Sequence, residues 1–171
     1  MPIENHFLNN AFITNIICSV IENICNVKTQ IKWPNDILIN KEKISGIISE
    51  IFSTNNNKYI NTGIGVNIIS SPKIDNYPTT NLNNYNKKIN NLNFVHKLMQ
   101  EYFNNLKQLQ NNHHRIMKDY QSRLLYLGKN IKLKINKERI QHGIFHSLNL
   151  DGSITLKNNV NFENIYNARI V

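Results

Sequence analysis

The first third of the chain changes from a helical to a strand-like spacing of hydrophobic residues. Between residues 8 and 25 the apolar side chains recur at three- and four-residue intervals, which is the period of an amphipathic helix. Further on, short runs of branched apolar residues at 29–33, 37–39, 44–52 and 59–69 are separated by turn-forming polar residues. The pattern predicts one helix followed by an antiparallel meander of strands.

The middle of the chain is predicted to be a long loop followed by two helices. Residues 70–91 are rich in Asn, Pro and Ser, which is typical of a loop. Asn93 then resembles the N-cap of a helix with an apolar face. A further helix is predicted from about His113 to Leu127, with Gly128 as its C-cap.

From residue 130 the spacing changes again, to alternation. Four or five short strands are predicted, with a turn at 149–152, and this suits a small, partly closed β barrel of SH3-like proportions. A domain boundary is therefore placed between residues 1–127 and 128–171. The predicted fold class is α+β, a mixed or antiparallel sheet with helices packed on it, followed by the barrel.

The net charge does not by itself single out a binding surface. The chain carries 20 Lys and Arg against 11 Asp and Glu, a formal charge of +9. The basic residues never form a run of five or six like charges, so a general bias toward Asn, Ile and Lys is the preferred interpretation. Nucleic-acid binding is kept as an alternative.

The cysteines and the absence of long apolar runs bear on the compartment. Cys18 and Cys25 are seven residues apart in the predicted first helix, on one face and too far apart to form a disulfide, so they are interpreted as reduced core residues. No stretch approaches the roughly 18 uninterrupted apolar residues of a membrane span, and a secretory signal pattern is absent. A cytoplasmic protein without membrane contact is expected.

The stretch KWPND, at residues 32–36, interrupts the predicted hairpin. Pro34 cannot donate a ladder hydrogen bond, and Asn35 and Asp36 are poor strand formers. A β-bulge is predicted here, and it would aim the two polar side chains into a cavity. The alternative is a simple surface turn.

Glycines on the neighbouring strands point to a ligand floor. Gly46, Gly63 and Gly65 interrupt otherwise apolar strands, where a missing side chain lets another group approach the backbone. Lys43 follows Asp36 by seven residues across a turn, so its ammonium should return to the same end of the hairpin. The residues predict a flat ligand over the glycines, with Lys43 available to an anion.

Two motifs resemble those of a known family. The stretch KWPNDILINKEKISGIISE, at residues 32–50, and the stretch NTGIGVNI, at residues 61–68, are similar to the central and following motifs of the biotin protein ligases. The order of helices and C-terminal strands also resembles that family, over essentially the whole chain. Lipoate ligases share the broader fold but do not usually present KWPND in this form. The resemblance implies a class II synthetase-like ligase core.

The resemblance also implies a two-step reaction. The carboxylate of biotin attacks the α-phosphate of ATP, and a lysine of a biotin carboxyl carrier protein then attacks the mixed anhydride. Lys43 matches the motif lysine that would stabilise the anionic groups, and Asp36 matches a residue that orients the acceptor amine. Asn35 and Asp36 match the nucleotide-binding pair, and Asn67 an asparagine near the phosphates and Mg²⁺.

The remaining implied site residues line the biotin ring. Gly46 and Gly63 would permit close packing, and Ile48 and Val66 would form an apolar wall. Lys43 is included in the biotin site as well as in catalysis. No metal site made by protein residues alone is predicted, because Mg²⁺ would enter with ATP.

Four further residues receive plainer interpretations. Trp33 is predicted to be a buried anchor, with ligand contact as the alternative. Glu50 matches a family position but is equally explained as a strand residue facing solvent. His113 and His114 are adjacent, point to different helix faces and are interpreted as surface residues.

The chain also departs from the family pattern. Upstream of the first helix, family members carry a glycine- and arginine-rich loop that closes over biotin and the adenylate. Only Arg115 and Arg123 precede the predicted barrel, and neither is beside a glycine. The predicted activity of this chain alone is therefore low, and a non-catalytic biotin- or carrier-binding module is the alternative. The expected partner is the carrier protein of acetyl-CoA carboxylase or a related carboxylase; specific DNA binding is not expected, and a homodimer is left open.

Overall fold

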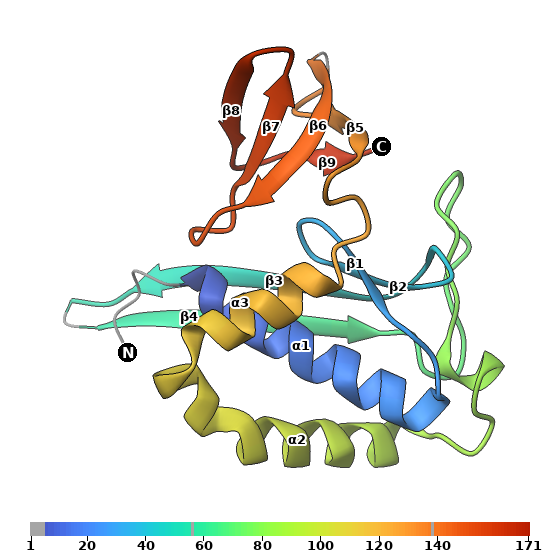
Figure 1. The fold of residues 1–171 in the computed structure, drawn as a ribbon. Coiled ribbons are helices and arrows are strands. Elements are labelled where there is room, and N and C mark those ends of the chain that lie inside the picture. The colour runs from blue at the N-terminus through green and yellow to red at the C-terminus, as the bar shows by residue number, and fades with distance from the viewer. Residues whose placement is uncertain (1–5, 56, 138) are drawn as a thin grey trace.

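The computed structural model describes residues 6–55, 57–137 and 139–171. Three helices and a four-stranded sheet form the first part of the chain, and a five-stranded sheet forms the second (Figure 1). The helices are α1 (His6–Cys25), α2 (Asn91–Asn111) and α3 (His113–Ser122), with the short 3₁₀ turn η2 (Leu82–Asn84) before α2. The strands are β1 (Gln30–Lys32), β2 (Asp36–Ile39), β3 (Glu42–Ser53), β4 (Lys58–Val66), β5 (Asn130–Lys134), β6 (Ile140–Leu148), β7 (Ile154–Asn158), β8 (Asn161–Ile165) and β9 (Arg169–Ile170).

The first sheet is antiparallel and has the order β1-β2-β3-β4. Helix α1 packs against β3 and lies in contact with both α2 and α3, so the helices form a layer on the sheet. The predicted first helix and the meander are confirmed. Ile17, Ile21, Ile37, Ile44 and Ile47 are at most 1% exposed and form the centre of this core, because branched apolar side chains fill a helix–sheet interface well.

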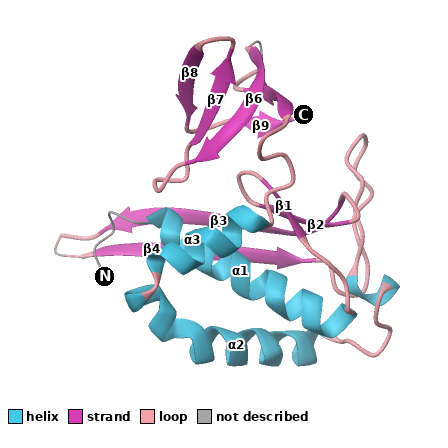
Figure 2. Cartoon of the chain, in the orientation of Figure 1, coloured by secondary structure: helices cyan, strands magenta, loops and turns pink. Residues whose placement is uncertain are grey.

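The second sheet is also antiparallel, with the order β8-β7-β6-β5-β9. Figure 2 shows it as an all-strand unit at the top of the view, above the first sheet and its helices. Leu133, Phe145, Ile154 and Leu156 are completely buried inside it, yet they belong to the same connected core as the first part of the chain. The α+β class with antiparallel sheets is confirmed, whereas the SH3-like barrel and the boundary between residues 127 and 128 stay predictions.

The two predicted later helices differ from the structure at their ends. Helix α2 has Asn90 and not Asn93 as its N-cap: the Asn90 side chain accepts a hydrogen bond from the Asn93 N–H at 2.9 Å. Helix α3 ends at Ser122, five residues before the predicted Leu127, because the chain leaves the helix to bond the outer edge of β1. The Leu125 N–H donates to the Ile31 carbonyl at 2.9 Å.

Gly128 is likewise not a helix cap. Its φ of +77° belongs to the turn before β5, and its N–H donates to the Phe145 carbonyl at 2.8 Å. The glycine therefore connects the two parts of the chain and does not terminate a helix.

Both cysteines are free, as the sequence indicated. Burial raises the pKa of Cys18 to about 12, so its thiol stays protonated and unreactive at neutral pH. None of the helices in the described part of the chain combines the length and hydropathy that a membrane span requires.

A polar network ties α1 to the start of the sheet. The Arg123 guanidinium lies 3.0 Å from a Glu22 carboxylate oxygen, and the Thr29 hydroxyl donates to the same carboxylate at 2.6 Å. Burial alone would raise the pKa of Glu22, but the bonds from Arg123 and Thr29 outweigh it and lower that pKa. The network therefore stabilises the ionised form of Glu22.

This lowered pKa predicts an acid-dependent loss of stability. Because the carboxylate has a lower pKa in the folded than in the unfolded chain, Glu22 stabilises the fold above its unfolded pKa of about 4.3, and the contribution disappears as pH falls through the folded pKa. In urea unfolding at pH 7 and below pH 4, Arg123→Met should reduce the pH dependence of the unfolding free energy. Arg115→Met removes an exposed ion pair with Asp119 and should leave that dependence unchanged. An identical pH dependence in wild type and Arg123→Met would contradict the assignment.

Candidate active site

The KWPND stretch forms the tight connection between β1 and β2. Trp33–Asn35 make a turn that starts with a cis Trp33–Pro34 peptide, and Lys32 pairs with Asp36 across the hairpin. The predicted β-bulge at this point is wrong, because a proline and two turn formers end one strand and begin the next. A register shift does occur nearby: the β2–β3 pairing skips Ile44.

The structure brings Lys43 and Asp36 into direct contact. The Lys43 Nζ lies 2.5 Å from the Asp36 Oδ1, and the two side chains are 29% and 18% exposed. The space beside them exists because residue 46 is glycine: a Cβ there would lie 3.1 Å from the Lys43 Nζ and 3.4 Å from the Asp36 Oδ1. A partly buried ammonium is thus held at a fixed place on one face of the sheet.

The loop after β4 returns across this ion pair. The Lys43 N–H donates to the Pro78 carbonyl at 2.8 Å, and the Thr80 N–H donates to the Lys43 carbonyl at 2.9 Å. The Tyr77 hydroxyl donates to the other Asp36 oxygen, Oδ2, at 2.5 Å. Burial and this hydrogen bond both raise the pKa of Tyr77, so the phenol is neutral and acts as the donor.

Tyr77 is a site residue that the sequence interpretation missed. It lies in the polar loop at 70–91, where nothing in the spacing distinguishes it from other loop residues. The only signal is the pair Tyr77–Pro78, an aromatic residue before a proline, which fixes an extended conformation. Sequence alone does not tell which strand such a loop will contact.

Positive charge gathers around the Tyr77 ring. The Lys32 Nζ lies 4.6 Å and the Lys43 Nζ 5.8 Å from the ring centroid. Burial lowers the pKa of Lys32, the neighbouring Asp36 acts in the opposite direction, and the charges of Arg169 and Lys43 lower it further. Lys32 and Lys43 thus lie over the ring of Tyr77, which bonds Asp36, and the charge of Arg169 in β9 acts on both Lys32 and Tyr77. Such an excess of positive charge favours an anionic ligand.

The predicted ligand floor lies on the same face as the ion pair. Gly46 pairs with Gly65, and Ile48 pairs with Gly63, so all four residues face the same side of β3 and β4. Ile48 is 64% exposed there, and neither Gly63 nor Gly65 has a side chain to cover it. The three glycines and Ile48 therefore form an open apolar surface next to Lys43.

Val66 does not share this surface. It pairs with Ser45, whose side chain faces the opposite side of the sheet from Gly46. Val66 therefore packs against the core on the helix side of the sheet. The prediction that Val66 forms one wall together with Ile48 is therefore wrong, because neighbouring strand residues face opposite sides.

Asn67 and Asn35 have backbone contacts that fix the edges of the site. The Asn67 side-chain amide donates to the Thr80 carbonyl at 3.0 Å and to the Lys43 carbonyl at 3.4 Å. The Asn35 carbonyl accepts from the Ile47 N–H at 3.0 Å. Asn67 therefore holds the returning loop against β3, and ligand binding by either asparagine stays a prediction.

The plainer interpretations agree with the structure. Trp33 is 2% exposed, so the prediction of a buried anchor is confirmed. Glu50, His113 and His114 are exposed. The described residues contain no group of three His, Cys, Asp or Glu side chains that could hold a metal ion.

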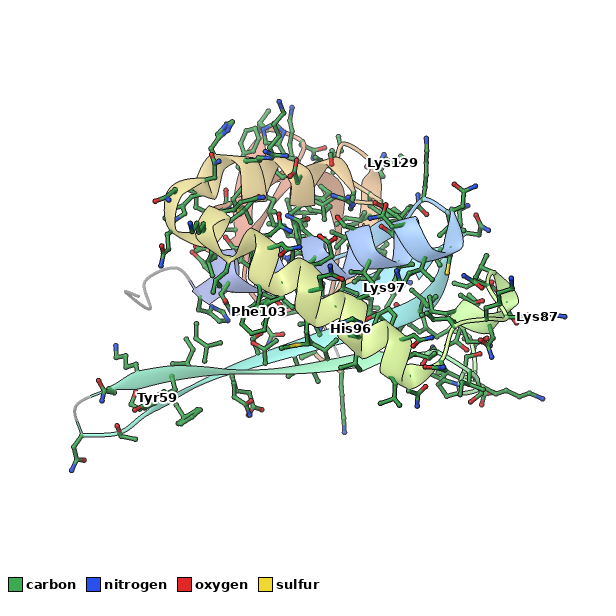
Figure 3. All side chains as sticks on the ribbon, turned by 90° about the horizontal axis from the view of Figure 1, so that it is seen from below. Tyr59, Lys87, His96, Lys97, Phe103 and Lys129 are labelled. Atoms are coloured by element: carbon green, nitrogen blue, oxygen red, sulfur yellow. The ribbon has the colours of Figure 1, made fainter. Side chains whose placement is uncertain are left out.

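An apolar hollow of about 500 Å³ lies on the other face of the sheet, between β4, α1 and α2. Ile64 and Thr62 line it. They pair with Ile47 and Ser49, whose side chains face the side of the sheet opposite to Gly46. Figure 3 shows Phe103 on α2, on the helix side of the sheet, and Tyr59 toward the outer end of the β3–β4 hairpin. The hollow is therefore separate from the Lys43–Asp36 site.

The basic residues labelled in Figure 3 are spread over the molecule. Lys87, Lys97 and Lys129 come from the loop after β4, from α2 and from the segment before β5, and they lie apart from one another. These three lysines do not form a common patch.

Comparison with known proteins agrees with the motifs. Residues 4–67 match the biotin/lipoate A/B protein ligase family. A 53-residue part of the chain is 42% identical to the bifunctional ligase/repressor BirA of Bacillus subtilis, covering 30% of this chain and 16% of the relative. A longer alignment, 24% identical over 130 residues, covers 75% of this chain and 47% of the biotin–[acetyl-CoA-carboxylase] ligase of Mycobacterium tuberculosis. The aligned parts thus span less than half of these curated relatives.

Solved structures share the fold over nearly the whole chain. The apo biotin protein ligase of Aquifex aeolicus superposes with a TM-score of 0.79 and 23% identity, covering 98% of this chain and 75% of that one. The same enzyme in complex with biotin and ATP gives a TM-score of 0.74 and 22% identity, covering 96% and 70%.

The motif segment and the fold together define the class. Residues 4–67 match the biotin/lipoate A/B protein ligase family, and the chain has the fold of solved biotin protein ligases. The resemblance predicted from its motifs is confirmed in this sense.

Proposed function

We propose that the chain binds biotin and ATP at the Lys43–Asp36 face of the sheet and forms biotinyl-5'-AMP. The observation that carries the proposal is the Lys43 ammonium, held 2.5 Å from Asp36 above Gly46 and beside an open apolar surface. An ammonium at this place would neutralise the biotin carboxylate as it approaches the α-phosphate. A carboxylate oxygen then bonds to the α-phosphorus, and pyrophosphate leaves as its bond to that phosphorus breaks.

The second step transfers the biotinyl group to a protein lysine. The lysine amine attacks the carbonyl carbon of the mixed anhydride, an amide forms, and AMP leaves. Asp36 is proposed to orient that amine. The proposed acceptor is the biotin carboxyl carrier protein of acetyl-CoA carboxylase or of a related carboxylase, in keeping with the name of the mycobacterial relative.

The nucleotide is proposed to bind at the positively charged side of the site. Asn35 and Asp36 would contact it, and Asn67 would lie near its phosphates. Because both Asp36 oxygens are already engaged by Lys43 and Tyr77, Mg²⁺ is proposed to enter as its complex with ATP. Gly46, Gly63 and Ile48 would contact the biotin ring.

One observation favours binding without catalysis as the second candidate. Tyr77 and Lys43 each hold one oxygen of Asp36, so the carboxylate is already used in contacts within the chain and has only its remaining lone pairs for an acceptor amine. A chain that keeps this arrangement would hold biotin or a carrier protein and transfer nothing.

One assay separates the two candidates. The chain is incubated with biotin, Mg²⁺ and ATP, pyrophosphate release is followed, and a carrier protein is then added and weighed by mass spectrometry. Ligase function predicts pyrophosphate release and a carrier heavier by one biotinyl group. Calorimetric binding of biotin or of the carrier protein without pyrophosphate release identifies the binding module, and binding of neither overturns both candidates.

A further inference from the structure

A turn of the C-terminal sheet reaches the back of the candidate active site. Residues 149–153 connect β6 to β7, and Figure 1 shows this turn pointing toward the start of α1. The Trp33 indole N–H donates to the Gly152 carbonyl at 2.9 Å. Trp33 thus links the KWPND turn to a residue 119 positions further along the chain.

The approach of this turn requires a glycine. Gly152 has a φ of +89°, and a Cβ there would lie 2.3 Å from the Phe7 ring. The Phe7 ring packs edge-on against Tyr120, with ring centroids 5.4 Å apart. The turn, the start of α1 and α3 therefore meet in one packed contact.

Tyr120 extends that contact to the site. Its side chain is completely buried, and its hydroxyl donates to the Pro34 carbonyl at 3.0 Å. Trp33 and Pro34 are therefore each held by a hydrogen bond, one through a side chain and one through a carbonyl. The next two residues are Asn35, whose carbonyl is bonded to β3, and Asp36.

We propose that the β6–β7 turn is a positioning element of the site, which acts through Trp33 and Tyr120 to set Asp36 opposite Lys43. Trp33 and Tyr120 are positioning residues, since neither contacts the proposed ligands. The inference concerns the geometry of the chain itself, and only its catalytic meaning rests on the proposed function.

The reactivity of Lys43 toward an acylating reagent tests the inference without any ligand. An amine held against a carboxylate and beneath a loop is shielded, so the wild-type protein should acylate more slowly at Lys43 than at the exposed Lys41 of the same hairpin turn. Rates are followed with an N-hydroxysuccinimide ester and peptide mass spectrometry, and the ratio of the two sites is the readout. Lys41 thereby serves as an internal control.

Two variants should change this ratio. Tyr120→Phe removes only the hydroxyl that holds Pro34, whereas Trp33→Phe removes the indole donor together with part of the buried ring and keeps an aromatic side chain. Each should raise the Lys43-to-Lys41 ratio by about fivefold, which is the effect expected from the loss of one neutral hydrogen bond. In an Asp36→Asn background the same changes should have no effect on the ratio, because the ion pair that they act through is gone.

A matched control comes from the same contact. The Gln121 side chain donates to the Leu148 carbonyl at 3.3 Å, beside the turn but without reaching the KWPND stretch. Gln121→Met should therefore leave the ratio unchanged. An unchanged ratio in both Tyr120→Phe and Trp33→Phe overturns the inference, and so does an equal rise in Gln121→Met, which would indicate general loosening.

The same proteins separate this inference from the proposed function. If wild type fails to bind biotin in calorimetry, the proposed function fails, while the acylation ratio still decides the positioning role. If wild type binds biotin and Tyr120→Phe has an unchanged ratio, the positioning role alone fails.

Discussion

Replacing Lys43 by methionine is expected to weaken biotin binding by between about tenfold and a hundredfold, the range expected for loss of a hydrogen bond to a charged group. Methionine keeps an unbranched side chain of similar length, so the packing of the stem over Gly46 is retained. What disappears is the ammonium, which in the structure lies 2.5 Å from Asp36. Binding is measured by calorimetric titration with biotin, first alone and then with ATP and Mg²⁺.

Lys41 provides the matched control for this prediction. It lies two residues earlier in the same hairpin, is exposed, and carries the same charge. Lys41→Met should bind biotin as wild type does, because a charge in open solvent is screened from the ligand. Equal losses in the two variants would show that net charge and not the position of Lys43 controls binding.

The fold should survive the removal of Lys43. Asp36 would lose its ion pair, but its other oxygen would keep the hydrogen bond from Tyr77, and its side chain is 18% exposed to water. The double variant Lys43→Met with Asp36→Asn removes both charges and should unfold at a temperature close to that of wild type. A loss of biotin binding in this double variant, without a loss of stability, would separate the chemistry of the site from its structural role.

The elements predicted from spacing alone are those with a clear periodicity of apolar residues. Helix α1 keeps three- and four-residue intervals although β3, α2 and α3 bury it on more than one side, and the β1–β4 meander shows branched residues between turn formers. In both cases local propensity and tertiary burial agree, and the prediction follows from the pattern. The five-stranded C-terminal sheet was predicted for the same reason.

The wrong predictions of helix ends lie where several neighbouring residues suit the same backbone position. Asn90, Asn91 and Asn93 are all residues that can cap a helix, and in the structure the Asn90 side chain does so by accepting the Asn93 N–H. The apolar residues after Ser122 continue a helical pattern, yet the chain leaves α3 to bond Ile31 at the edge of β1. A long-range hydrogen bond of this kind has no signature in local sequence.

The sequence predicted two central residues of the candidate site, but it did not predict the backbone turn or the distant segments that hold them. Asp36 and Lys43 were expected at the same end of the hairpin, and they do meet. The predicted bulge is a turn, however, and Tyr77 and Gly152 enter from distant segments. Both distant contacts depend on the path of a loop through space, and the spacing of apolar residues along the chain does not predict that path.

The glycine at position 46 offers a way to remove the site while keeping the sheet. Gly46→Val is expected to lower biotin binding by at least about tenfold, because the new side chain displaces the charged group that anchors the ligand. A Cβ at residue 46 would already lie 3.1 Å from the Lys43 Nζ and 3.2 Å from its Cε. These atoms are the far end of a flexible side chain, so Lys43 will swing away at little cost to the fold, and valine suits a strand better than glycine does.

The cross-strand partner Gly65 supplies the control. Among the described residues, the only atom within 4 Å of a Cβ there is the Gly46 carbonyl oxygen, at 3.9 Å, so Gly65→Val has room and should leave the Lys43–Asp36 pair intact. The acylation ratio of Lys43 to Lys41 should therefore rise in Gly46→Val and stay at the wild-type value in Gly65→Val, with both proteins folded by circular dichroism. If Gly46→Val keeps both the wild-type ratio and wild-type biotin affinity, the ammonium above residue 46 is not the group that receives the ligand.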